Sequence, residues 1–194
     1  IKKEGVIKMK TIVFSHPWSN SFNKSILDNI TKKLDEKKEE YVIIDLYKDG
    51  FNPILTEEDL KVYSKGEYTD SLVERYQEIL KNTEELILVF PVWWSTMPAM
   101  MKGFFDKVML HNFAYENQKM GIKGLLTNIK SAKVITTATS PKVIMSILGF
   151  GMVMKVGILG GIGVKKSKWI HCSLHFSNND EKRKKFLDKV KNFI

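Results

Sequence analysis

The amino-acid sequence predicts a doubly wound α/β domain, in which helices cover both faces of a five-stranded parallel sheet. Short apolar, β-branched runs alternate along the chain with longer segments whose apolar residues recur at helical spacing. Such alternation is typical of right-handed βαβ units. The 194-residue chain is 43% hydrophobic, which suffices for the core of one domain. Periodic sequence begins just after Met9, so residues 1–8 are interpreted as an N-terminal extension or tag remnant and residues 9–194 as the domain.

Two strands and two helices are predicted in the first third of the chain. The apolar run TIVFS at residues 11–15 predicts a strand, and the amphipathic stretch at 22–38 predicts the helix that follows it. The run YVIIDL at 41–46 is almost continuously apolar, as expected for a strand covered on both faces. Thr56 precedes acidic residues, which is the pattern of a helix N-cap and first turn.

The middle of the chain repeats this alternation. A helical stretch at 72–81 leads into a third strand at 86–90. Pro98 suits the first turn of a helical stretch at 97–110, because proline is tolerated where helical N–H groups have no partner. Residues 111–130 are expected to form a long irregular connection.

The last third is predicted to contain two more strands, at 133–137 and 167–174, and a closing helix capped by Asn179 or Asp180. In doubly wound sheets, ligands bind outside the carboxyl ends of the strands, where the strand order reverses. The loops in which functional residues are expected are therefore 16–21, 91–97 and 138–142.

Charge and hydropathy argue against two classes of function. The net charge is +9, but the lysines are scattered and no recognition-helix, zinc-finger or RRM signature accompanies them, which favours a solvated surface and no nucleic-acid partner. Residues 143–164 are long enough to cross a bilayer and contain one charge, Lys155. Six glycines and that central charge argue against an integral membrane segment, so we expect a buried or dimer-forming surface.

The single Cys172 argues against a disulfide framework and fits a reducing compartment. The chain also starts without the apolar core of a secretory signal. We therefore expect a cytoplasmic protein.

The first loop and the residues after it, HPWSNSFN at 16–23, crowd hydroxyls, amides and backbone N–H groups at a helix N-terminus, an arrangement that suits a phosphate. Ser21 or Asn20 serving only as a helix cap explains the same spacing equally well. No G-x-G-x-x-G and no Walker lysine is present. His16 on its own is more often structural than catalytic.

The second loop, PVWWSTMP at 91–98, is bounded by two prolines that stiffen its backbone. Trp93 and Trp94 could be core residues, since large aromatic side chains are usually highly buried. A ligand site is favoured because both tryptophans stand beyond the end of a strand, where this fold places its pocket. The third loop adds threonine and serine hydroxyls at 136–140, a weak signal by itself. An anion site beside a planar-ring site matches the shape of flavin mononucleotide.

Three blocks of sequence carry a resemblance to a known family. They are H-x-x-x-x-S-F-N at 16–23, DLYKDGFNPILTEEDL at 45–60, and FPVWWSTMPAMMKGFFDKV at 90–108 followed by HNFAY at 111–115. Together they resemble the flavodoxin-like NAD(P)H:quinone oxidoreductases, essentially from Met9 onward. The resemblance implies a sheet order of 2-1-3-4-5, a bound FMN or FAD with FMN preferred, and ping-pong transfer of hydride from NAD(P)H to a quinone or similar acceptor. It also implies a homodimer.

The resemblance also implies roles for individual residues. The flavin phosphate end would be held by His16, Ser21, Phe22 and Asn23. The flavin ring would be lined by Pro91, Val92, Trp93, Trp94 and Ser95, and its pyrimidine edge by Thr137, Thr139 and Ser140. Trp94 and Tyr115 would contact the acceptor. No catalytic acid and no metal ligand is assigned, because the cofactor supplies the redox chemistry.

Two other functions remain open from the sequence. The first is a one-electron carrier like flavodoxin, although such carriers are usually acidic and this chain is basic. The second is an ancillary subunit that regulates a membrane transporter. Unaided oxidation of NAD(P)H with a quinone separates an enzyme from both.

Overall fold

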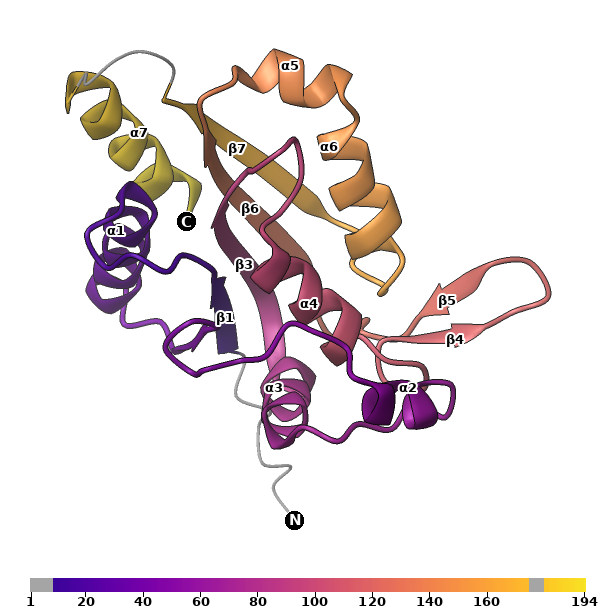
Figure 1. Ribbon diagram of the computed structural model, residues 1–194. Coiled ribbons are helices and arrows are strands. Elements are labelled where there is room, and N and C mark those ends of the chain that lie inside the picture. The colour runs from indigo at the N-terminus through magenta and orange to yellow at the C-terminus, as the bar shows by residue number, and fades with distance from the viewer. Residues whose placement is uncertain (1–8, 175–179) are drawn as a thin grey trace.

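The computed structural model describes residues 9–174 and 180–194, and its centre is a five-stranded parallel sheet with the order β2-β1-β3-β6-β7 (Figure 1). The order confirms the predicted doubly wound fold, with β6 and β7 as the fourth and fifth strands. The chain reverses direction across the sheet between β1 and β3, which creates the switch point. The strands are β1 (Met9–Phe14), β2 (Tyr41–Asp45), β3 (Thr83–Pro91), β6 (Ser131–Ala138) and β7 (Ser167–Ser173).

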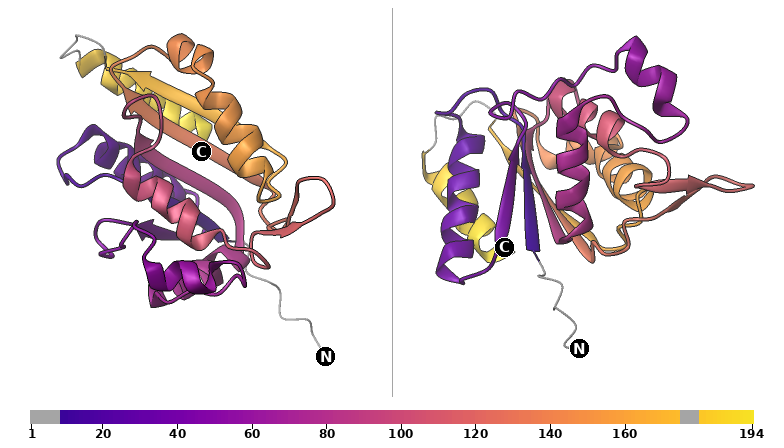
Figure 2. Two further views of the ribbon diagram at one scale, coloured as in Figure 1. Left: turned by 45° about the vertical axis from the view of Figure 1, so that its right-hand side comes forward. Right: turned by 90° about the horizontal axis from the view of Figure 1, so that it is seen from below.

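Helices cover both faces of the sheet, as Figure 2 shows. The helices α1 (Phe22–Glu36) and α7 (Asp180–Phe193) pack on one face, around Ile12 and Val89. On the other face, α3 (Ser71–Lys81) and α4 (Ala99–Val108) pack around Leu86 and Leu88. Strands with buried apolar residues on both faces need this double cover.

The start of α2 shows the expected capping chemistry, whereas the predicted cap of the closing helix stays a prediction. Thr56 precedes α2 (Glu57–Tyr63) and accepts a hydrogen bond from the Asp59 N–H at 3.1 Å, while the Asp59 carboxylate accepts one from the Thr56 N–H at 3.0 Å. Asp180 is the first residue of α7, whereas Asn179 lies outside the described residues.

The expected irregular connection at 111–130 contains an antiparallel hairpin. Its strands are β4 (Tyr115–Asn117) and β5 (Ile122–Gly124), and in Figures 1 and 2 they extend from the body as an arm. The turn closes through Gly121, whose φ of +79° is a conformation that favours glycine. Prediction missed the arm because three-residue strands are too short to show alternation.

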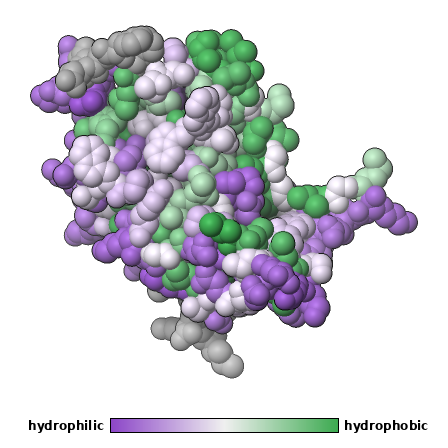
Figure 3. All heavy atoms as spheres, viewed as in Figure 1, coloured by the Kyte–Doolittle hydropathy of each residue, from purple (hydrophilic) through white to green (hydrophobic). Residues whose placement is uncertain are grey.

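Residues 143–164 fold into consecutive short helices: α5 (Lys142–Ile147), α6 (Phe150–Met152) and the π-helix η1 (Val153–Gly160). Gly149, with φ of +83°, separates α5 from α6. Across the described residues, no helix combines the length and apolar character that a bilayer crossing needs. Met145 and Phe150 are buried, but Ile147 and Val156 are 75% and 64% exposed, so the segment is only half buried. Figure 3 shows apolar residues gathered over α5 and along α6.

Candidate functional site

The carboxyl ends of β1, β3 and β6 border a cleft of about 360 Å³, at the edge of the sheet where a ligand site was predicted. This volume lies in the range of small-molecule sites. The lining residues are His16, Trp18, Ser21, Phe22, Asn23, Pro91, Val92, Trp93, Thr137, Ala138, Thr139, Leu174 and Arg183. The structure therefore brings together residues of all three predicted loops.

Four residues with predicted roles do not line this cleft. Trp94 and Ser95 stand on the solvent side of their turn, and Ser140 follows the lining residue Thr139. Tyr115 lies in β4, where its ring contacts the ring of His111. The binding roles of all the predicted residues remain predictions.

The start of α1 combines a helix cap with the geometry of an anion site. The Ser21 hydroxyl accepts a hydrogen bond from the Lys24 N–H at 3.1 Å, which confirms the capping interpretation. The N–H groups of Phe22 and Asn23 lie ahead of the first intrahelical hydrogen bond and remain without an acceptor in the helix. The Ser21 cap therefore leaves these two N–H groups free for an anion, because the cap uses a different N–H group.

Arg183 brings a positive charge to the same end of the cleft. Its guanidinium carbon lies 5.9 Å from the Phe22 ring centre, and one terminal nitrogen lies 3.6 Å from an Asp180 carboxylate oxygen. Its Nε is buried without a hydrogen-bond partner in the described residues. Sequence reasoning missed Arg183 because it stands in a lysine-rich segment, and nothing in that segment indicates that α7 packs beside α1.

Two further buried polar atoms near the cleft have no hydrogen-bond partner in the described residues, the Asn23 Oδ1 and the Ser15 Oγ. Asn23 Nδ2 donates to the Thr137 hydroxyl at 2.9 Å, which joins the first loop to the third. Buried polar groups in native proteins nearly always have partners. The free Asn23 oxygen is therefore available to accept a hydrogen bond from a donor in the cleft.

His16 presents a neutral ring to the cleft. Its Nδ1 accepts the Trp18 N–H at 3.1 Å, so the proton resides on Nε2. Burial lowers the pKa of His16. The ring meets Trp93 edge-on at a centroid distance of 6.2 Å. Nε2 is thus available as a donor near neutral pH.

The tryptophan loop is a tight turn with two residues in the left-handed conformation. Trp93 and Thr96 exchange backbone hydrogen bonds at 3.0 and 3.1 Å, and between them Trp94 and Ser95 have φ of +49° and +62°. Trp93 is 45% exposed and Trp94 is 99% exposed, so the core-packing alternative is wrong for both. The Val92 N–H donates to the Thr137 carbonyl at 2.7 Å and is not free for a ligand.

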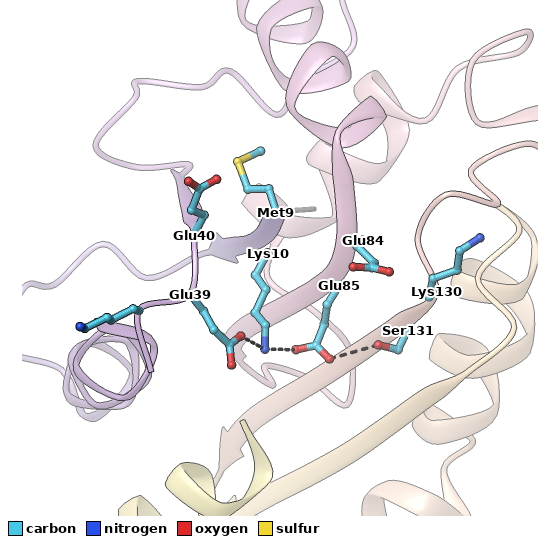
Figure 4. Close-up of a pocket in the computed structure, with 9 residues that line it drawn as sticks. Met9, Lys10, Glu39, Glu40, Glu84, Glu85, Lys130 and Ser131 are labelled. Atoms are coloured by element: carbon cyan, nitrogen blue, oxygen red, sulfur yellow. Dashed lines mark hydrogen bonds and ion pairs between the residues drawn. The ribbon is translucent and has the colours of Figure 1, made fainter. Parts of the chain in front are cut away.

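A larger hollow of about 640 Å³ lies at the opposite end of the sheet (Figure 4). Three of its charged residues pair with one another: Lys10 lies 2.5 Å from Glu39 and 3.3 Å from Glu85. Glu85 also accepts a hydrogen bond from the Ser131 hydroxyl at 3.1 Å. The hollow lies where the strands begin, far from the switch point, so the cleft at the carboxyl ends is the better candidate site.

Known proteins share this fold. An uncharacterized NAD(P)H oxidoreductase of Haemophilus influenzae is 34% identical over 66% of this chain, and the match spans 64% of that relative, less than two thirds of its length. The crystal structure of Smu.1420 from Streptococcus mutans is 33% identical, with a TM-score of 0.84 over 95% of this chain and 97% of its own. The NAD(P)H:quinone oxidoreductase from Methanothermobacter marburgensis is 26% identical, with a TM-score of 0.83 over 95% of this chain and 96% of its own.

A family model described as flavodoxin-like fold matches residues 9–194, which is the whole of the predicted domain. The strand order, the double helical cover and the cleft at the switch point agree with that match. The chain belongs to this flavodoxin-like family.

Proposed function

We propose that this protein is a cytoplasmic, flavin-dependent NAD(P)H oxidoreductase that reduces quinones or similar acceptors. The cleft is the observation that carries the proposal, because the N-terminus of α1, where N–H groups lack helical acceptors, borders it together with the proline-bounded tryptophan loop. The names of the Haemophilus and Methanothermobacter relatives support the reaction class. FMN is preferred to FAD as the cofactor, with NAD(P)H as the co-substrate.

The residues of the cleft fit a flavin. The start of α1 and the Arg183 guanidinium would hold the phosphate, and the unpartnered Asn23 oxygen would accept from a ribityl hydroxyl. Pro91 and Trp93 would wall the ring, with the Thr137 hydroxyl at its polar edge. When bound, the flavin would supply the redox chemistry, taking hydride from NAD(P)H and passing it to the acceptor in a ping-pong cycle.

The chain's own residues would orient the reactants and exclude water. His16 would donate from Nε2 without carrying charge, because its Nδ1 is already an acceptor. Trp93 would keep one side of the cleft apolar, which strengthens polar contacts inside it. The acceptor-binding roles of Trp94 and Tyr115 require a further surface over the cleft, since neither side chain lines it within one protomer.

We further propose that a second copy of the chain supplies this surface. The α5–η1 segment carries five apolar residues that are each more than half exposed: Val143, Ile147, Met152, Val153 and Val156. Large exposed apolar patches are uncommon on monomers. Ile147→Glu should shift the protein from dimer to monomer in sedimentation velocity. Met120→Glu, a change of an exposed apolar residue at the tip of the arm, serves as the charge-matched control. A wild-type protein that sediments as a monomer at every concentration refutes the dimer.

Flavin binding is tested by titrating FMN into the purified protein and following the loss of flavin fluorescence. Arg183→Met should weaken FMN binding about 10-fold or more, because a hydrogen bond to a charged group contributes about 1.5–3 kcal/mol. Lys185→Met is the matched control, since Lys185 is exposed on the same helix and pairs with Glu181 at 2.6 Å. Equal FMN affinity in the two variants contradicts the phosphate site.

Activity is tested with NADH or NADPH and a soluble quinone in the absence of other proteins. Double-reciprocal plots of rate against NAD(P)H concentration at several quinone concentrations should give parallel lines, because the two substrates are expected to bind in turn at one site. A protein that binds FMN but oxidises neither nucleotide is not the proposed enzyme, and the electron carrier and the ancillary subunit then remain.

A further inference from the structure

Side chains of β7 hold the loop that follows β6. The Ser173 hydroxyl donates to the Thr139 carbonyl at 3.2 Å, and His171 Nε2 lies 3.0 Å from the Ser140 carbonyl. The Leu174 N–H donates to the Ala138 carbonyl at 2.6 Å. Three consecutive carbonyls, from the last residue of β6 into the loop, are therefore tied to β7 and the residue that follows it.

The protonation state of His171 follows from its partners. A carbonyl oxygen only accepts, so the Nε2 of His171 carries the hydrogen and donates it to Ser140. Nδ1 then accepts from the Thr136 hydroxyl at 2.8 Å, and that hydroxyl accepts from the Trp169 Nε1 at 2.8 Å. The donor and the acceptor of each of these three hydrogen bonds are therefore fixed, from the Trp169 indole through Thr136 and His171 to the Ser140 carbonyl. Thr136 is fully buried and His171 is 8% exposed, so water does not compete.

The tethered carbonyls orient the peptide groups of the loop. The described peptides contain no cis bond, and in a trans peptide the N–H points opposite to the C=O. Because the Thr139 carbonyl faces β7, the Ser140 N–H points away from β7. The residues just before it, Thr137 to Thr139, line the cleft.

We propose that His171, as a neutral Nε2–H imidazole, is a positioning residue that fixes the 138–141 loop for binding the polar edge of the flavin ring. The inference rests on the proposed function, since it assigns the loop to the flavin. Burial lowers the pKa of His171, against the effect of its bond to Ser140, and the nearby charge of Lys142 lowers it further. The imidazole therefore stays neutral near neutral pH, where a cytoplasmic enzyme works.

The test compares three variants on β7 by FMN titration. His171→Phe removes both hydrogen bonds, and we expect FMN affinity to fall about 10-fold. His171→Gln keeps a donor at the position of Nε2, so its affinity should stay within about 3-fold of wild type. Cys172→Ala is the matched control, because Cys172 is buried on the same strand and packs on the opposite side of the sheet. Equal affinity in His171→Phe and Cys172→Ala overturns the proposal.

A second readout needs no flavin. Nitrogen chemical shifts of the His171 ring in the apo protein should show a protonated Nε2 and an unprotonated Nδ1 at pH 7. Backbone order parameters of Thr139 and Ser140 should fall in His171→Phe and remain at the wild-type value in Cys172→Ala. An Nδ1–H tautomer or unchanged order overturns the positioning role. A wild type that shows the expected tautomer and order but binds no FMN refutes the proposed function alone.

Discussion

Asp59→Asn should unfold this protein more easily at neutral pH and remove part of its sensitivity to acid. Asp59 is 5% exposed, and its carboxylate accepts hydrogen bonds from the Thr56 N–H and the Thr69 hydroxyl. The carboxylate also lies 3.4 Å from the buried Lys107 ammonium, so it joins α2 to the loop before α3 and to α4. Burial alone would raise the pKa of Asp59, but these hydrogen bonds and the Lys107 charge outweigh it and lower the pKa from 3.8 to about 2.

The size of the effect follows from that pKa. A folded-state value below the unfolded one stabilises the protein above pH 4, by about 2 kcal/mol here, and the stabilisation is lost as pH falls from about 4 to 2. Asp59→Asn loses this contribution at pH 7 and leaves Lys107 with Asp70, 3.5 Å away, as its remaining carboxylate. Because a buried cation that loses a partner costs further free energy, the total is expected to be about 2–4 kcal/mol.

The assay is urea unfolding followed by tryptophan fluorescence at several pH values between 7 and 3. Glu57→Gln is the control on the same helix, because the Glu57–Lys61 pair is exposed and contributes about 0.5 kcal/mol or less. The free energy of unfolding of Asp59→Asn should fall less steeply below pH 4 than that of wild type. Parallel curves for the two proteins over that range would refute the reasoning.

Two further substitutions test local geometry through the midpoint of urea unfolding. Ser95→Gly should stabilise the protein by about 0.5–1 kcal/mol, because it relieves a left-handed φ in the tryptophan turn, whereas Ser95→Ala should not; equal midpoints would show that the turn is unstrained. Gly103→Ala should destabilise by about 2 kcal/mol, since its Cβ would lie 2.3 Å from Pro53, while Gly157→Ala meets nothing within 4 Å and serves as the control. A neutral Gly103→Ala would mean that the Pro53 loop moves freely.

The position of the site was predictable because it follows from the fold. Once the strand order is known, the loops after the first, third and fourth strands must meet, and residues of all three line the cleft. The Thr56 cap was predictable because capping depends on neighbours three residues apart. The arm at β4 and β5 was missed, since strands this short carry no periodic signal.

Local sequence determined the five strands of the main sheet, most of the helices that cover it, and the loops that carry polar or aromatic residues, because those properties depend on neighbours within a few positions. Tertiary packing alone decided that Arg183 lies beside Phe22, that Trp94 faces solvent, and that His171 reaches Ser140 across 31 positions of chain. Such contacts join segments that the sheet and helices bring together, and no periodic pattern in either segment encodes the other's approach.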